Sequence, residues 1–191
     1  MKTTSIMIVG VGGQGTLLAS RLIGDVLIQK GYDVKLSEVH GMSQRGGSVV
    51  TYVKYGEKVY SPIVDAGEAD FILSFEAIEG ARWLGRLKAG GVLITNDRET
   101  YPMPVITGAM AYPEKPTEKL AGLVNTVSVN ALRMAEEAGS AKAVNTVLLG
   151  VLSRYMTEIE ESAWLEAMDK RVKPAFIELN KRAFQMGRNV R

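Results

Sequence analysis

Cysteine is absent from the 191-residue sequence, and histidine occurs only once, as His40. A chain without cysteine forms no disulfide, offers no thiol nucleophile and holds no iron–sulfur cluster with its own thiolates. A single histidine also makes a self-contained zinc site a poor fit. We therefore expect no metal site and no redox cofactor held by this chain alone.

Long apolar runs are also missing. No stretch approaches the roughly 20 apolar residues that cross a bilayer, and the apolar run within MKTTSIMIVG is too short for a signal peptide. We expect a cytoplasmic protein with no membrane partner. The net charge is only +2. Although Lys and Arg outnumber Asp and Glu after Glu166, a nucleic-acid site needs a broader basic face with interleaved aromatic residues, so we expect no nucleic-acid partner.

What the sequence does contain is an alternation of buried strands and helices. Residues 6–9 are apolar on both faces, as a strand of a parallel sheet requires. Leu18, Leu22 and Val26 recur at four-residue spacing and predict an amphipathic helix that ends near Gly31. The alternating pattern of YDVKLSEV then predicts a second strand. Strand, helix and strand form a βαβ unit, whose crossover is expected to be right-handed.

The rest of the chain extends this pattern. We expect a β-hairpin around Gly56-Glu57, a strand at 70–75, a helix at 77–88, strands at 92–96 and 103–108, and a C-terminal helical segment that Asn130 caps. The expected fold class is α/β, a Rossmann-like, doubly wound, mostly parallel sheet with a hairpin insertion and a helical C-terminal segment. No repeat or low-complexity linker divides the chain, so residues 1–191 are predicted to be a single domain.

A glycine-rich turn joins the first strand to the first helix. It comprises Gly10, Gly12, Gly13, Gln14, Gly15 and Thr16. Its glycines fit the G-x-G-x-x-G pattern, and backbone amides with the positive end of the helix dipole would favour an anion here. Glu38, at the end of the second strand, lies where an acid can hold a ribose hydroxyl. A free-standing NAD(P)- or flavin-binding oxidoreductase is one hypothesis, and glycines that serve packing alone are another.

The nucleotide hypothesis meets two difficulties. The chain is short for a dehydrogenase, which usually adds a substrate domain, and no acid/base pair stands out. A lone histidine beside a strand end, such as His40, is more often structural than catalytic. Glu76 and Glu79 begin a predicted helix, where carboxylates stabilise the dipole. We therefore assign no catalytic residue.

A second polar loop follows the second strand. It comprises Ser43, Gln44, Arg45, Gly46 and Gly47 within EVHGMSQRGGSV. Loops that follow the strands of a doubly wound sheet lie at its carboxyl edge, so this loop should lie beside the glycine turn. The Arg45 guanidinium would then face the same anion, for which its fork geometry is suited. The other possibility is that Arg45 only pairs with a neighbouring carboxylate and that the glycines permit a hairpin. Asn145, a polar residue in an apolar helical pattern, is expected to hydrogen-bond a nearby loop.

The two loops together carry a resemblance to a known family. GVGGQG followed by EVHGMSQRGGSV resembles the small, gamma-type component of the 2-oxoacid:ferredoxin oxidoreductases, and within that family the beta subunit of the indolepyruvate enzymes. The similarity extends through YSPIVDAGEADFILSFEAIEGARWL, GGVLITN and AVNTVLLGVLS to ELNKRAFQMG. Residues 101–124 carry little of it.

The resemblance implies an accessory subunit of a heteromeric enzyme that oxidatively decarboxylates indolepyruvate or another aryl 2-oxoacid. It implies that the acyl group passes to coenzyme A and the electrons to ferredoxin. In that family thiamine diphosphate and the iron–sulfur clusters belong to a larger partner subunit, which agrees with the absence of cysteine here. The glycine turn and the Arg45 loop would line the access side for coenzyme A or substrate. An isolated copy is expected to be able to form a homodimer through the surface meant for its partner.

Overall fold

The computed structural model describes residues 3–38, 43 and 45–190. Its centre is a six-stranded sheet with the order β2-β3-β1-β4-β5-β6. The strands are β1 (Thr3–Val11), β2 (Asp33–Glu38), β3 (Ser48–Gly56), β4 (Ala69–Ser74), β5 (Leu87–Asn96) and β6 (Thr126–Val129). The α-helices are α1 (Thr16–Gln29), α2 (Ala77–Trp83), α3 (Met103–Ile106), α4 (Pro116–Ala121), α5 (Ala131–Ala138), α6 (Val144–Ser153), α7 (Glu161–Arg171) and α8 (Ile177–Arg188). Short 3-10 helices among the described residues include η2 (Leu84–Arg86), η3 (Ala141–Ala143) and η4 (Pro174–Phe176).

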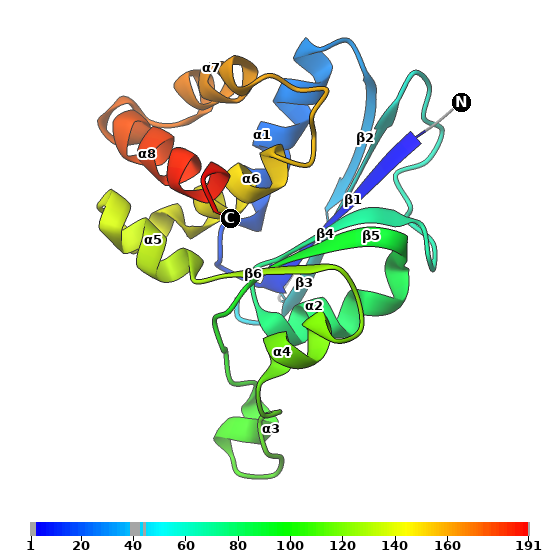
Figure 1. Ribbon diagram of the computed structural model, residues 1–191, viewed down its shortest axis with the longest axis vertical. Coiled ribbons are helices and arrows are strands. Elements are labelled where there is room, and N and C mark those ends of the chain that lie inside the picture. The colour runs from blue at the N-terminus through cyan, green and yellow to red at the C-terminus, as the bar shows by residue number, and fades with distance from the viewer. Residues whose placement is uncertain (1–2, 39–42, 44, 191) are drawn as a thin grey trace.

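The sheet is mostly parallel. β1, β4, β5 and β6 pair in parallel, whereas β3 lies antiparallel between β1 and β2. Helices α1, α5, α6, α7 and α8 cover one face, and α2 and α4 cover the other (Figure 1). The predicted Rossmann-like, doubly wound α/β fold with a helical C-terminal segment is therefore confirmed. Among the described residues, none of the helices has the length and apolar character needed to cross a membrane.

The prediction of a β-hairpin around Gly56-Glu57 is wrong. β3 ends at Gly56, and the described residues 57–68 form no strand. The antiparallel element is instead made by β3 with its two neighbours. Val59 and Val64 explain the misleading apolar pattern, because both are buried, at 3% and 0% exposed, from an irregular loop. Burial of single side chains from a loop gives the same sequence signal as a half-buried strand.

Two element boundaries also differ from the prediction. The helix expected over 77–88 ends at Trp83, and β5 begins at Leu87 and runs through the Gly90-Gly91 pair. A Cβ at Gly91 would lie 3.0 Å from the carbonyl oxygens of Ala69 and Asp70, so this glycine allows close approach to β4 and does not end a helix. The short strand expected over 103–108 is instead helix α3. Its second residue is Pro104, and proline is favoured in the first turn of a helix.

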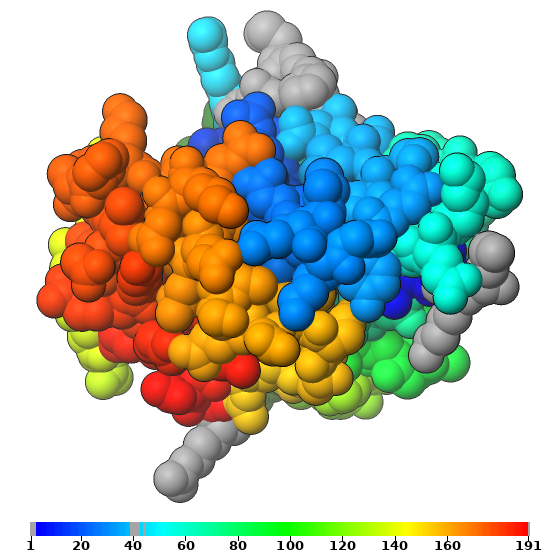
Figure 2. Space-filling view, turned by 90° about the horizontal axis from the view of Figure 1, so that it is seen from above, coloured from blue at the N-terminus to red at the C-terminus, as the bar shows by residue number. Residues whose placement is uncertain are grey.

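The core lies on both faces of the sheet but is much larger on one. Ile6 and Ile8 of β1 contribute to the larger cluster, and the alternate residues Met7 and Val9 to the smaller one. Helices α6 and α8 cross closely in the larger cluster. The blue surface of α1 adjoins the orange surface of α7 (Figure 2), where Arg171 forms an ion pair with Asp25.

Candidate functional site

The glycine turn between β1 and α1 is shaped by close contacts. Gly13 and Gly15 have φ angles of +96° and +87°, a region that favours glycine. A Cβ at Gly10 would lie 2.9 Å from Cβ of Phe75, so the turn packs directly on the residue that follows β4. The Gln14 side chain folds back, and its Oε1 accepts a hydrogen bond from the Val11 amide at 2.8 Å. The glycines therefore have a packing role whether or not an anion binds.

The N-terminus of α1 opens at this turn. Gly15 is the N-cap, and it provides no side-chain hydrogen bond to the first-turn amides. These amides and the positive end of the helix dipole favour a negatively charged group. Asn145 of α6 is 4% exposed and its Nδ2 donates to the Gly15 carbonyl at 3.4 Å. The predicted contact of Asn145 with a nearby loop is confirmed, and that loop is the glycine turn.

The second polar loop lies directly against the glycine turn. The Gly12 amide donates to the Gly47 carbonyl at 2.9 Å, and the Gly46 amide donates to the Gly12 carbonyl at 3.3 Å. The Gly47 amide also donates to the Ser43 carbonyl at 3.0 Å. A Cβ at Gly47 would lie 2.8 Å from Cα of Ser43, so only glycine fits. The expectation that both loops meet at one sheet edge is confirmed, whereas Gln44 and His40 lie outside the described residues.

This pairing of loops argues against a dinucleotide site. In a Rossmann nucleotide fold the acidic residue that holds the ribose follows the strand beside β1. Here β3 separates β1 from β2, so Glu38 is one strand farther away. Its Oε1 accepts from the Ser20 hydroxyl at 2.8 Å. The Gly12 amide, which a pyrophosphate would need, already donates to Gly47.

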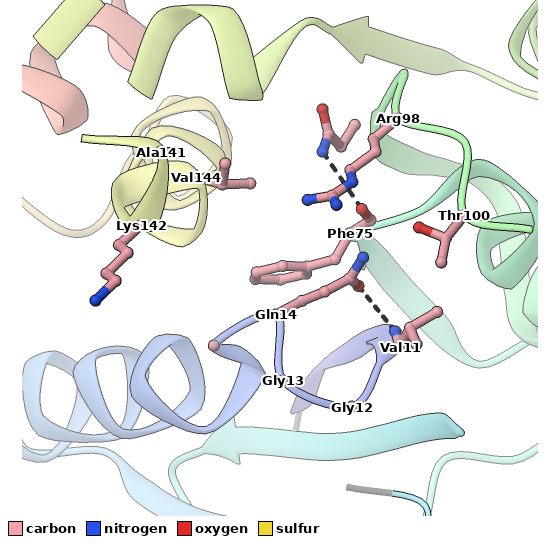
Figure 3. Close-up of a pocket in the computed structure, with 12 residues that line it drawn as sticks. Val11, Gly12, Gly13, Gln14, Phe75, Arg98, Thr100, Ala141, Lys142 and Val144 are labelled. Atoms are coloured by element: carbon pink, nitrogen blue, oxygen red, sulfur yellow. Dashed lines mark hydrogen bonds between the residues drawn. The ribbon is translucent and has the colours of Figure 1, made fainter. Parts of the chain in front are cut away.

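A cavity of about 590 Å³ opens beside the glycine turn. Its walls include the turn itself, Phe75 and two cationic side chains, Arg98 from the loop after β5 and Lys142 from η3 (Figure 3). Asn96, Thr100, Ala141 and Val144 complete the lining. Arg98 and Lys142 are both exposed to solvent. The cavity therefore combines backbone amides, a helix N-terminus and two positive charges, which together suit an anionic ligand.

Arg98 and Lys142 were missed by the sequence reasoning. Arg98 follows the carboxyl end of a predicted parallel strand, so the rule that placed Arg45 at this edge could have placed Arg98 there too. Lys142 gave no such signal, because its position depends on how the C-terminal helices pack. Arg45 is exposed and is not among the residues that line this cavity.

Openings continue on the other sides of the turn. A cavity of about 270 Å³ is lined by Gly12, Gly13, Gly15, Thr16, Leu17, Val49 and Thr51. Another of about 210 Å³ lies between Gly46-Gly47, the start of α2 and residues 100–103. Among the predicted site residues, Gly12 to Thr16 of the turn and Gly46-Gly47 of the second loop thus line at least one of these three cavities.

Glu76 holds the loop after β5, which carries Arg98, against the start of α2. It is 1% exposed and caps α2 by accepting from the Glu79 amide at 2.9 Å. Its other oxygen accepts from the Tyr112 hydroxyl at 2.7 Å and from the Thr100 amide at 3.3 Å. Burial and this hydrogen bond raise the pKa of Tyr112 above its usual value. The expected position of Glu76 at the start of a helix is confirmed, and its carboxylate also holds two points, Thr100 and Tyr112, of the loop after β5.

Comparison with known proteins agrees with this arrangement. The family described as "Pyruvate ferredoxin/flavodoxin oxidoreductase" matches residues 5–190. The indolepyruvate oxidoreductase subunit IorB of Thermococcus kodakarensis is 42% identical, over 98% of this chain and 95% of that protein. The subunit of the same name from Pyrococcus horikoshii is 39% identical over the same shares.

A solved structure also matches over nearly the whole length. The gamma subunit of a keto/oxoacid ferredoxin oxidoreductase from Geobacter sulfurreducens superposes with a TM-score of 0.71 at 26% identity. The match covers 96% of this chain and 95% of that one. Both the sequence and the fold thus point to one group of proteins. The chain belongs to the pyruvate ferredoxin/flavodoxin oxidoreductase family.

Proposed function

We propose that this chain is an accessory subunit of a 2-oxoacid:ferredoxin oxidoreductase that acts on indolepyruvate or a related aryl 2-oxoacid. The observation that carries the proposal is the whole-length similarity to subunits named for indolepyruvate oxidoreductase. The relatives are matched over nearly their full length, so the resemblance does not rest on one shared motif. A cytoplasmic location and ferredoxin as the acceptor are parts of the same proposal.

The redox chemistry belongs to a larger partner subunit in this proposal. The reaction removes carbon dioxide from the 2-oxoacid, passes two electrons to ferredoxin and joins the acyl group to the sulfur of coenzyme A. Thiamine diphosphate and iron–sulfur clusters would serve these steps. Because this chain has no cysteine, it offers no thiolate to hold a cluster. None of its residues is therefore assigned to electron transfer.

The contribution of this chain is a surface that accepts an anion, at the carboxyl edge of the sheet. We call this surface the anion edge; it comprises the glycine turn, the Arg45 loop, Arg98 and Lys142. Arg98, from the loop after β5, and Lys142, from η3, are both among the residues that line the cavity beside the glycine turn (Figure 3). The phosphates of coenzyme A and the carboxylate of the oxoacid are both anions that such an edge can hold. The predicted site residues of the turn and of the Arg45 loop are part of this proposal, with backbone amides as donors and Arg45 as a third cation.

Three single substitutions in the assembled enzyme test the anion edge. Arg98→Ala, Lys142→Ala and Arg45→Ala each remove one positive charge from the surface of the enzyme. If the charge contacts coenzyme A or the oxoacid, KM for that substrate should rise about tenfold, equivalent to about 1.4 kcal/mol. Steady-state kinetics with each substrate varied in turn makes the measurement.

Lys88→Ala is the matched control for these variants. Lys88 pairs with Asp70 at the start of β5, at the opposite edge of the sheet from the cavity, and its removal should leave both KM values unchanged. If all three test variants assemble normally and keep both KM values, this chain only supports the shape of the complex. Calorimetry of the isolated chain with NAD(P) or a flavin tests the competing hypothesis, which binding of either would revive.

A further inference from the structure

The loop between β5 and α4 forms an arm that extends away from the body of the protein. We define the arm as residues 98–112, with α3 near its tip (Figure 1). Four large apolar side chains are exposed on it: Tyr101 at 53%, Met103 at 66%, Ile106 at 64% and Met110 at 65%. Single exposed apolar residues are ordinary, but four within ten residues form a patch that points to a partner.

The arm is an ordered element with its own internal bonding. The Thr107 amide donates to the Met103 carbonyl at 2.9 Å, and the Met110 amide donates to the Pro104 carbonyl at 3.0 Å. At the base, the rings of Tyr101 and Tyr112 lie 4.9 Å apart. Glu76 holds the base to α2 through the hydrogen bonds to Thr100 and Tyr112. The exposed side chains are thus presented on a backbone fixed at both ends.

The tip of the arm has no charge. The segment YPMPVITGAM, residues 101–110, contains no Asp, Glu, Lys or Arg. A surface that recognises it would be an apolar hollow, filled by flexible methionine side chains and a β-branched isoleucine. Binding through such a surface depends on apolar area and changes little with salt.

We infer that the arm is the docking element for the large subunit that bears thiamine diphosphate and the iron–sulfur clusters. The inference rests on the proposed function. Its structural basis is that the base of the arm borders the candidate site: Arg98 and Thr100 line the large cavity, and residues 101–103 line the adjoining one. Whatever covers the arm therefore lies at the mouth of the anion edge.

The position of the arm favours the large subunit, and not a second copy of this chain, as the partner that binds it. Substrate held at the anion edge must reach cofactors that this chain does not carry. A partner seated on the arm is the one positioned to bring those cofactors to the edge. A second copy seated there would add another chain without redox groups and would obstruct the same opening.

A charged double substitution tests the inference in the assembled complex. This chain, with Met103→Glu and Ile106→Glu together, is co-expressed with the large subunit, which is recognised by its bound thiamine diphosphate and its iron–sulfur absorbance. Native mass spectrometry and gel filtration measure assembly. We expect the apparent Kd between the subunits to rise at least about tenfold, because two carboxylates would enter an apolar hollow. The loss should persist at high salt.

Tyr60→Glu is the matched control. Tyr60 is 87% exposed, the largest such value among the exposed apolar side chains that the structure describes. It follows the end of β3, which pairs with the start of β1, and so lies at the edge of the sheet opposite the arm. Assembly of this variant should equal that of the unsubstituted chain. Far-UV circular dichroism of both variants checks the fold, and Met110→Glu provides a second arm variant should the first fail to fold.

The outcomes separate the two proposals. If the unsubstituted chain and the arm variants assemble equally well with the large subunit, the docking inference is wrong and the proposed function stands. If the unsubstituted chain binds no thiamine-dependent iron–sulfur subunit, the proposed function fails and the inference with it. Loss of a homodimer without loss of the heteromeric complex would assign the arm to self-association and would also overturn the inference.

Discussion

The two faces of the sheet are covered to different degrees. On one face α1, α5, α6, α7 and α8 form a thick layer. It buries Trp164 and Phe184, whose ring centroids lie 6.0 Å apart. On the other face α2 and α4 form a thin layer over a smaller cluster that includes Met7, Ile72 and Leu93. The arm leaves the body on the side of the thin layer (Figure 1).

Because of this difference, we expect the thick layer to determine folding stability and the arm beside the thin layer to determine assembly with a partner. Burial of apolar surface stabilises a fold by roughly 25 cal/mol per Å², so the thick layer supplies most of the free energy of unfolding. The thin layer contributes less, and its arm exposes apolar side chains that a partner can cover. Substitutions in the thick layer should therefore change global stability, and substitutions at the arm should change local order and assembly.

The largest effect is expected at the crossing of α6 and α8. A Cβ at Gly187 would lie 2.0 Å from the Val147 carbonyl oxygen, which is fixed backbone and cannot turn away. Gly187→Ala must push the helices apart, and we expect it to lower the free energy of unfolding by about 3 kcal/mol. Urea denaturation followed by circular dichroism measures the change.

Gly85→Ala is the control on the opposite face. Gly85 lies in η2 beside the thin layer, and a Cβ there would meet no atom within 4 Å. We expect its stability to remain within about 0.5 kcal/mol of the unsubstituted protein. Equal losses from the two substitutions would contradict the contrast between the layers.

A smaller and more local effect is expected at the base of the arm. Glu76→Gln keeps the shape of the side chain but replaces one acceptor oxygen of a buried carboxylate with an amide donor. The Tyr112 hydroxyl and the amides of Thr100 and Glu79 cannot all keep their bonds to it, and we expect a local cost of about 2 kcal/mol. Hydrogen exchange in peptides that span the arm should become about 30-fold faster.

The thick layer supplies the reference for that measurement. Peptides from α6 and α8 should exchange at unchanged rates in Glu76→Gln, because the arm can open without opening the core. Glu99→Gln is the matched variant, since Glu99 is exposed and accepts only from Tyr101 among the described residues. Uniformly faster exchange in Glu76→Gln would mean that the arm and the core unfold together.

The thick layer was more predictable from the sequence than the thin one. The C-terminal helices have strong signals: Asn130 caps α5 by accepting from the Arg133 amide, and Gly139 ends it with a φ of +119°. The arm lacked such signals. Its apolar residues suggested a strand because an exposed docking surface and a half-buried strand can share one hydropathy pattern.

The site was predictable only in part, for a physical reason. The two glycine loops could be placed together because both follow strands, and loops that follow the strands of a doubly wound sheet lie at its carboxyl edge. That rule depends on the topology of the sheet alone. Arg98 was accessible to the same rule, whereas Lys142 reaches the cavity only through packing of η3 and α6 beside α1. The antiparallel insertion of β3 next to β1 was not apparent either. That single strand moves Glu38 away from the turn and argues against the nucleotide interpretation.

The smallest effect on the free energy of unfolding is expected at Tyr55, on the face of the sheet that the thick layer covers, and this effect should depend on pH. Tyr55 is 3% exposed, and its hydroxyl donates to Glu158 at 2.5 Å. Burial first, and then the bond to Glu158, raise the pKa of Tyr55 above its usual value. At neutral pH, Tyr55→Phe should cost only about 1 kcal/mol, the value of one such hydrogen bond. Chemical denaturation across a pH series measures both this cost and its pH dependence.

The sign of the pH effect follows from the raised pKa. The unfolded chain ionises Tyr55 near pH 10, whereas the folded chain keeps its proton. Above about pH 10 the unfolded state therefore binds fewer protons, and the free energy of unfolding falls as pH rises. Tyr55→Phe should flatten that fall. Tyr112→Phe should flatten it less, because the arm can open locally and let Tyr112 ionise without global unfolding. Equal flattening by both variants would show that the arm base is as firmly held as the thick layer.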